Sequence, residues 1–188
     1  MTARGYGFGM TDLTGKKIAI IATDHFEESE LVTPRDELTS SGAEVKIYST
    51  GTDPIQAVEG DTSPTQKVEV DGVFSDLDVS TVDAVVVPGG TINADHLRVD
   101  EDAQSIVRQA IDSDKVVAVI CHGPWLLVNA GLAKGRTLTS YSSLRLDLEN
   151  AGASWKDEEV VVDGSLITSR NPDDLPAFVQ AITDALAG

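Results

Sequence analysis

Short apolar runs alternate with longer amphipathic segments along this chain. Runs rich in β-branched residues are typical of strands buried on both faces of a sheet. The sequence predicts such strands at residues 18–23 (IAIIAT), 43–50 (AEVKIYST), 83–90 (DAVVVPGG) and 116–120 (VVAVI). Two further short runs, 159–164 and 165–169, follow near the end of the chain.

Helical patterns separate these runs. The segment 25–42 has acids in its first turn, apolar residues at helical spacing and a terminal Gly42, which is a helix-ending signal. The other predicted helices are 100–115, 142–152 and 173–188. Alternating strands and helices imply right-handed crossovers and a mostly parallel sheet covered on both faces. We therefore expect an α/β three-layer sandwich with a doubly wound, flavodoxin-like sheet.

Residues 51–81 interrupt this alternation. They are rich in Gly, Pro, Asp, Ser and Thr and contain short alternating pieces such as KVEV. This composition predicts a small β excursion or hairpin.

Length and cysteine content limit the organisation and location of the protein. A chain of 188 residues fits one domain with an ordinary core. We assign residues 1–15 to an N-terminal extension and 16–188 to a single domain. One cysteine cannot form an internal disulfide. No signal peptide and no apolar run of about 18 residues is present, so we expect a cytoplasmic protein.

The charge excludes two classes of partner. Asp and Glu outnumber Lys and Arg by 31 to 14, which gives a formal net charge of -17. Such a surface repels phosphate backbones and anionic lipids, so we expect neither nucleic-acid nor membrane binding.

The candidate chemistry lies at Cys121, between the run VVAVI and a helix that begins near Gly123-Pro124. Ligands bind beyond the carboxyl ends of parallel strands, and a sharp strand-to-helix turn there exposes a nucleophile. A nearby helix N-terminus lowers a thiol pKa from about 8.5. The alternative is an inert core cysteine.

His122 is the candidate general base, an orienting residue or only a surface histidine. Class I glutamine amidotransferases also place cysteine on such a turn, but their histidine comes from a late segment of the chain. The corresponding segment here reads SRNPDDL and contains no histidine, so we do not expect glutamine hydrolysis by that triad. A metal centre is disfavoured, although His25, Glu27, Glu28 and Glu30 cluster, because ligand spacing typical of zinc is missing.

Several segments together resemble the PfpI-type branch of the ThiJ/PfpI superfamily, which has a class I glutamine amidotransferase-like fold. They are HFEESEL, VVVPGG, AVICHGPWLL and TSRNPDDLPAF. The resemblance covers nearly the whole chain beyond the N-terminal extension. Members are often labelled intracellular proteases or general stress proteins.

The resemblance implies roles for several residues. Glu27 would be the acid that hydrogen-bonds the nucleophile, although it could also be a helix-start acid. The backbone N–H groups of Gly90 and His122 would form the oxyanion pocket, with Gly89 in the same turn; these glycines could equally form only a tight turn.

The resemblance also implies that a homo-oligomer, at least a dimer, completes the site. Asp95 would reach a neighbouring subunit, although it could instead be a helix cap. The segment TINADHLR is one residue longer than the family form, which leaves the alignment of Asp95 open. Tyr141 and Arg170 match family positions near the pocket.

Three functions follow from these residues. The first is a thiol enzyme acting on small reactive carbonyls, as in the family's glyoxalase and deglycase members, with no metal or nucleotide cofactor. The second is a cysteine peptidase that uses Cys121, His122 and Asp95. The third is a redox-sensing or chaperone-like stress protein in which Cys121 is reversibly oxidised. We favour the first.

Overall fold

The computed structural model describes residues 11–188, and a seven-stranded sheet forms its centre. The strand order is β11-β12-β8-β7-β1-β3-β6, and all neighbours are parallel except β11 and β12. In chain order the strands are β1 Lys17–Ile21, β3 Glu44–Ser49, β6 Gly72–Val73, β7 Ala84–Val87, β8 Val116–Ile120, β11 Val160–Asp163 and β12 Leu166–Ser169.

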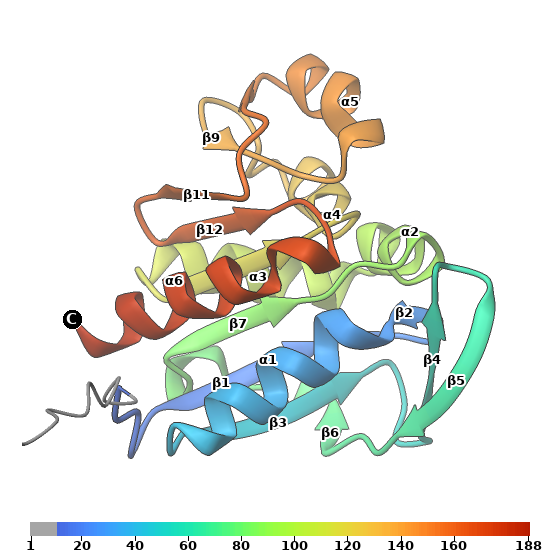
Figure 1. The fold of residues 1–188 in the computed structure, drawn as a ribbon, viewed down its shortest axis with the longest axis vertical. Coiled ribbons are helices and arrows are strands. Elements are labelled where there is room, and N and C mark those ends of the chain that lie inside the picture. The colour runs from blue at the N-terminus through green and yellow to red at the C-terminus, as the bar shows by residue number, and fades with distance from the viewer. Residues whose placement is uncertain (1–10) are drawn as a thin grey trace, which may run out of the picture.

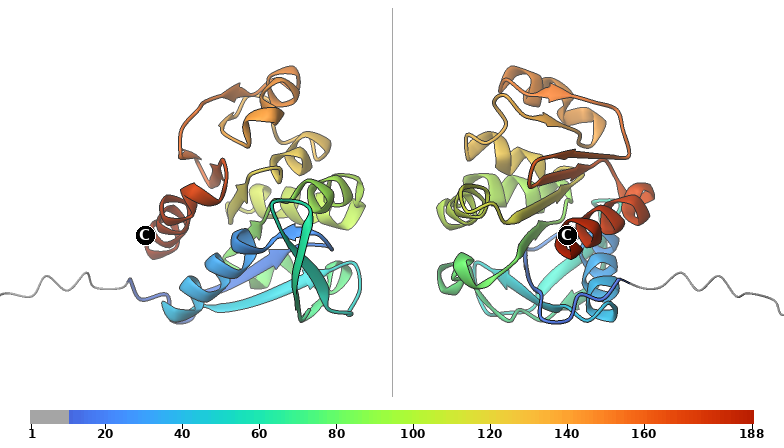
Figure 2. Two further views of the ribbon diagram at one scale, coloured as in Figure 1. Left: turned by 45° about the vertical axis from the view of Figure 1, so that its right-hand side comes forward. Right: turned by 90° about the vertical axis from the view of Figure 1, so that its left-hand side faces the viewer.

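Helices cover both faces of this sheet (Figure 1). The helices α1 (Glu28–Ser40) and α6 (Leu175–Ala187) lie on one face, and α3 (Glu101–Asp112) and α4 (Pro124–Asn129) lie on the other, as the right-hand view of Figure 2 shows. Alternate residues of β1 explain the two cores, because Ile18 and Ile20 belong to the first and Ala19 and Ile21 to the second. The predicted doubly wound sandwich is confirmed.

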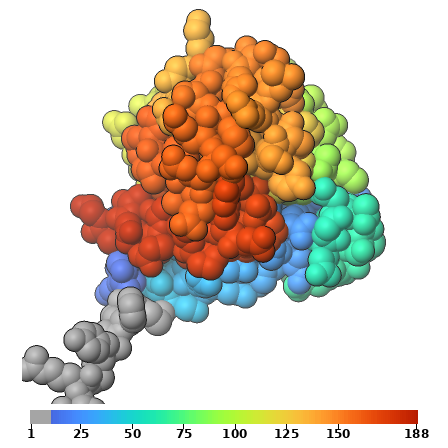
Figure 3. Space-filling model, turned by 45° about the horizontal axis from the view of Figure 1, so that its top comes forward, coloured from blue at the N-terminus to red at the C-terminus, as the bar shows by residue number. Residues whose placement is uncertain are grey.

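Smaller elements surround the sheet. The short strand β2 (Phe26–Glu27) pairs with β4 (Ile55–Glu59), which forms an antiparallel hairpin with β5 (Ser63–Val68). This hairpin confirms the β excursion predicted for residues 51–81, and it lies at one side of the molecule (Figure 3). The remaining elements are α2 Thr91–Val99, α5 Arg145–Asn150, β9 Thr137–Leu138, β10 Ser154–Trp155 and the 3-10 turns Phe74–Asp76, Val79–Thr81, Ser142–Leu144 and Pro172–Asp174.

The segment before β1 is only partly described. Residues 1–10 of the predicted extension lie outside the described residues. Leu13 is buried in the first core, and its N–H donates to the Ser41 carbonyl at 2.7 Å. None of the helices in residues 11–188 is long and apolar enough to cross a membrane.

Candidate active site

Cys121 occupies a sharp turn between β8 and α4. Its backbone has φ +63°, in the left-handed region that costs a non-glycine residue about 1–3 kcal/mol. Two backbone hydrogen bonds hold it there: its N–H donates to Ser169 O at 3.1 Å, and its carbonyl accepts from Tyr141 N at 2.8 Å. The strained turn expected from the sequence is present, and the surrounding strands maintain it.

The acid beside the sulfur is Glu30, which corrects the assignment of Glu27. Glu30 is wholly buried in α1, lies beside Cys121, where it adds to the effect of burial in raising the pKa of the thiol, and accepts from Gly89 N at 2.7 Å. The Glu27 carboxylate turns instead to the hairpin, where Gly60 N and Asp61 N lie 3.3 and 3.4 Å from its oxygens. Glu27 precedes α1, whereas Glu30 lies inside its first turn and faces the sheet.

Burial changes the proton affinity of this pair. Loss of water raises the pKa of Glu30 from its ordinary 4.5 to about 8, so most of the carboxyl is neutral at pH 7. Burial, followed by the nearby Glu30 carboxylate, also raises the pKa of the Cys121 thiol. The lowered thiol pKa expected from the helix N-terminus is therefore wrong for the resting chain, and the thiol needs a base that can take its proton.

Two backbone donors face the sulfur. The backbone N–H groups of Gly90 and His122 lie near the Cys121 sulfur and favour its thiolate form. Gly90 has φ +87°, which favours glycine. A Cβ at Gly89 would collide with the Glu30 carboxylate and would lie 2.6 Å from Cys121 Cβ. Close approach therefore requires glycine at both positions.

His122 provides the base that this thiol needs. Its Nδ1 lies 3.2 Å from Cys121 Sγ, and its Nε2 lies 3.5 Å from Ser143 Oγ. The ring stacks on Tyr141 with centroids 4.7 Å apart and meets Trp125 edge-on. Burial lowers the pKa of His122, so the imidazole is neutral at pH 7 and can accept a proton.

Sequence reasoning missed Asp61, an acid of the same chain that lies in the turn of the β4–β5 hairpin. Its carboxylate accepts from Thr91 N at 2.7 Å and from Thr91 Oγ1 at 2.8 Å. It also opposes the effect of burial by raising the pKa of His122. No local pattern marked it, because its position depends on the hairpin folding back over the turn that begins α2.

Two predicted site residues do not join Cys121 within this chain. Asp95 is exposed on α2 and is not among the residues that line the cavity beside Cys121, so its role across a subunit boundary stays a proposal. The prediction that Arg170 lies near the pocket is wrong. Its guanidinium pairs with Asp174 and with Asp157, each at 2.8 Å, and Arg170 is not among the residues that line the cavity. These carboxylates, Asp174 first, raise the pKa of Arg170 and hold it in an ion-pair network.

A cavity of about 250 Å³ gives access to the sulfur. Its lining residues are Glu27, Glu30, Gly60, Asp61, Gly90, Cys121, His122, Tyr141 and Pro172. A wider hollow of about 510 Å³ shares Glu27 and Pro172 with it. Within residues 11–188, no three His, Cys, Asp or Glu side chains are grouped as metal ligands. The cavity lining brings together a thiol, an imidazole and three carboxyl groups, which is a set suited to acid–base and thiol chemistry.

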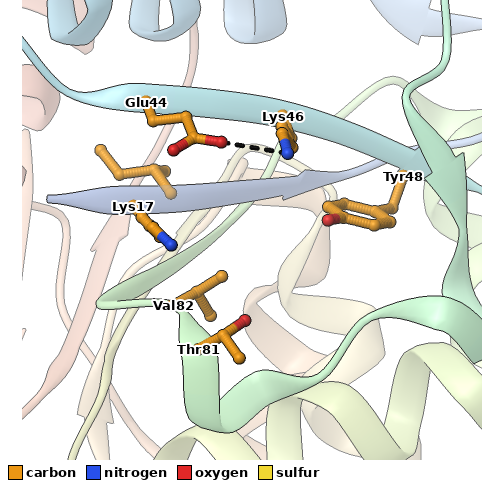
Figure 4. Close-up of a pocket in the computed structure, with 7 residues that line it drawn as sticks. Lys17, Glu44, Lys46, Tyr48, Thr81 and Val82 are labelled. Atoms are coloured by element: carbon orange, nitrogen blue, oxygen red, sulfur yellow. Dashed lines mark ion pairs between the residues drawn. The ribbon is translucent and has the colours of Figure 1, made fainter.

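A third, smaller cavity lies at the opposite, amino ends of the strands (Figure 4). It measures about 80 Å³, and Lys17, Lys46 and Tyr48 are among its lining residues. The Lys46 ammonium is paired with Glu44 at 3.0 Å. Neither Cys nor His is among the residues that line this cavity.

Two curated proteins align with most of this chain. The chain is 41% identical over 165 residues to protein/nucleic acid deglycase 2 of Escherichia coli, covering 87% of this chain and 93% of the relative. It is also 41% identical over 164 residues to the putative cysteine protease YraA of Bacillus subtilis, covering 87% and 94%.

Solved structures share the fold. Drosophila melanogaster DJ-1beta aligns with a TM-score of 0.84 at 29% identity, over 92% of this chain and 91% of that one. A two-domain protein from Anabaena variabilis, with DJ-1/ThiJ/PfpI-like and ferritin-like domains, aligns with a TM-score of 0.85 at 34% identity over 91% of this chain and 48% of that one. The DJ-1/PfpI family profile matches residues 16–185. The chain belongs to the DJ-1/PfpI family.

Proposed function

We propose that this protein is a cytoplasmic stress-protection hydrolase that uses Cys121 to attack small reactive carbonyls or glycated adducts. The observation that carries the proposal is the set of groups around one sulfur: the Glu30 carboxyl, the Gly90 and His122 N–H groups, and His122 Nδ1 at 3.2 Å. Relatives named as deglycases, at 39–41% identity, support the reaction class.

We infer the following proton transfers for a 2-oxoaldehyde. His122 accepts the thiol proton as the sulfur adds to the aldehyde carbon, and backbone N–H groups offset the charge on the oxygen that forms. His122 then gives this proton to that oxygen, which completes a hemithioacetal, and the neutral imidazole moves the C–H proton of the same carbon to the neighbouring carbonyl carbon. The hemithioacetal O–H proton passes to the second oxygen, which gives a thioester of a 2-hydroxy acid. Water cleaves the thioester: its hydroxyl joins the acyl carbon to release the acid, and its proton goes to the sulfur.

The reaction is tested with methylglyoxal as the probe and lactate as the measured product. We expect Cys121→Ser to abolish turnover and Glu30→Gln to lower kcat by about 10- to 100-fold, within the range of acid–base contributions. Glu37→Gln, an exposed position on the same helix, is the matched control and should retain full activity. Lactate formation by Cys121→Ser at the wild-type rate would refute the proposal.

Peptide hydrolysis is the second candidate, and the relative named as a putative cysteine protease favours it. In this case Asp95 of a neighbouring subunit completes the Cys121–His122 pair in a dimer or larger homo-oligomer. Cleavage of a fluorogenic peptide should then fall at least tenfold in Asp95→Asn and on dilution to the monomer, as judged by sedimentation. Cleavage that is insensitive to both changes would remove this candidate.

A further inference from the structure

Asn93 is a buried polar residue in the first turn of α2 that the mechanism above does not use. Its side chain is 0% exposed. Its Oδ1 accepts from Thr23 N at 2.7 Å and from Thr23 Oγ1 at 3.2 Å, and its Nδ2 donates to Pro88 O at 3.0 Å and Gly89 O at 2.9 Å. The amide therefore ties the chain after β1 to the turn after β7.

One of these bonds acts on the peptide that provides a donor to the sulfur. Gly89 C=O and Gly90 N–H belong to the same planar peptide unit, in which they point in opposite directions. Asn93 Nδ2 and, more weakly, Glu27 N at 3.3 Å hold the oxygen. Holding the oxygen on one side directs the Gly90 N–H to the other side, where Cys121 lies.

This peptide needs an external restraint because glycines flank it on both sides. Without a Cβ, each glycine populates φ values of either sign, so rotation of the peptide meets little steric resistance. The neighbouring donors have other partners, since Gly89 N donates to Glu30 and Thr91 N donates to Asp61. Gly90 N–H is left as the donor of this turn that faces the sulfur.

We propose that Asn93 is a positioning residue that fixes the Gly89–Gly90 peptide and so keeps the Gly90 N–H directed at Cys121. The inference rests on the proposed function, because it concerns how the nucleophile of that reaction is stabilised. Asn93 does not touch substrate; it acts through the orientation of one peptide.

The test compares a variant that loses the hydrogen bonds donated by Asn93 Nδ2 with a variant that loses one of the hydrogen bonds accepted by Asn93 Oδ1. Asn93→Asp keeps the side-chain shape and the oxygen that accepts from Thr23. It replaces the Nδ2 amino group, which donates to Pro88 O and Gly89 O, by an oxygen that repels these two carbonyl oxygens. Asn93→Ser is the second variant if the first does not fold. Thr23→Val removes one bond to Oδ1, keeps the Nδ2 donors, and is the matched control for lost stability.

The primary readout is the rate of Cys121 alkylation by iodoacetamide against pH, because it does not require turnover. A charge-assisted hydrogen bond to the thiolate is worth about one factor of ten, so the Asn93 variant should react about tenfold more slowly at pH 7, with a midpoint about one pH unit higher. With methylglyoxal, kcat should fall by a similar factor and KM should change less than twofold. Thr23→Val should stay within twofold of wild type in reactivity.

Two outcomes would overturn the inference: a folded Asn93 variant with the wild-type profile, or equal shifts in the Asn93 and Thr23 variants that follow their loss of thermal stability. If Cys121→Ser forms lactate at the wild-type rate, the proposed function fails instead. In that case amide exchange of Gly90 in ¹⁵N-glycine-labelled protein decides the positioning role. Exchange at least tenfold faster in Asn93→Ser supports it, and unchanged exchange overturns it.

Discussion

Replacing Glu30 with glutamine measures directly what burial does to this carboxyl. The comparison is best made in a Cys121→Ser background, so that thiol ionisation does not contribute. The folded pKa of Glu30 is about 8 against an ordinary 4.5. Between these values the folded chain holds a proton that the unfolded chain has released, so the free energy of unfolding falls as pH rises.

The magnitude follows from the same two values. Between the two pKa values, each pH unit lowers the free energy of unfolding by about 1.4 kcal/mol. The change per pH unit is smaller near pH 5, because the unfolded carboxyl is still partly protonated there. From pH 5 to pH 7.5 the Glu30 protein should therefore lose about 3 kcal/mol of unfolding free energy relative to Glu30→Gln.

The assay is urea unfolding followed by tryptophan fluorescence at several pH values. All other titrating groups are common to both proteins, so the difference between their unfolding free energies isolates position 30. Glu37→Gln, exposed on the same helix, should show a difference that is flat with pH. A flat difference for Glu30→Gln, or one in which glutamic acid becomes relatively more stabilising as pH rises, would refute the reasoning, because the carboxyl would then be ionised when folded.

Two further changes test the remaining groups at the site. Asp61→Asn removes a carboxylate that raises the pKa of His122, so the imidazole pKa measured by NMR titration should fall further; an unchanged or higher value would contradict the assigned electrostatic contact. Gly89→Ala places a Cβ 2.6 Å from Cys121 Cβ, which should cost about 1–3 kcal/mol of overpacking and slow the alkylation of Cys121. Wild-type thermal stability and reactivity in Gly89→Ala would show that the turn is looser than described.

Local patterns predicted the central fold because they are properties of single segments. The runs that became β1, β7 and β8 are buried on both faces and are β-branched, so burial and propensity agree. Helix α2 was not predicted. Two of the apolar residues in its sequence TINADHLRV, Ile92 and Val99, are exposed, and tertiary contacts through buried Asn93 and Leu97 support the helix instead.

The sequence predicted the site residues that are adjacent in the chain. It did not predict the acid on helix α1, because the rotation of that helix determines which acid faces the sheet. Cys121 and His122 follow directly from the strand-to-helix turn. The choice between Glu27 and Glu30 depended on which acid points inward, and a signal was present: Glu30, Pro34 and Leu38 form one buried stripe at intervals of four residues. A carboxyl on an apolar stripe marks a group with a special environment.

Long-range placement explains the other differences. Asp61 reaches the site through the pairing of β4 with β2, and Arg170 is held away from it by Asp157 and Asp174. Neither contact has a local sequence signature, because each joins residues that are brought together only by the finished fold.

The β4–β5 hairpin has a consequence for how relatives of this chain can diverge. It carries Asp61 close enough to His122 to oppose the effect of burial on the pKa of its imidazole, yet it belongs to a separate three-stranded sheet and shares no strand with the seven-stranded one. Insertions and deletions in its turn therefore leave the register of the central strands unchanged. The hairpin turn contributes Gly60 and Asp61 to the cavity lining, so changes in this turn alter the cavity without altering the strand that carries Cys121.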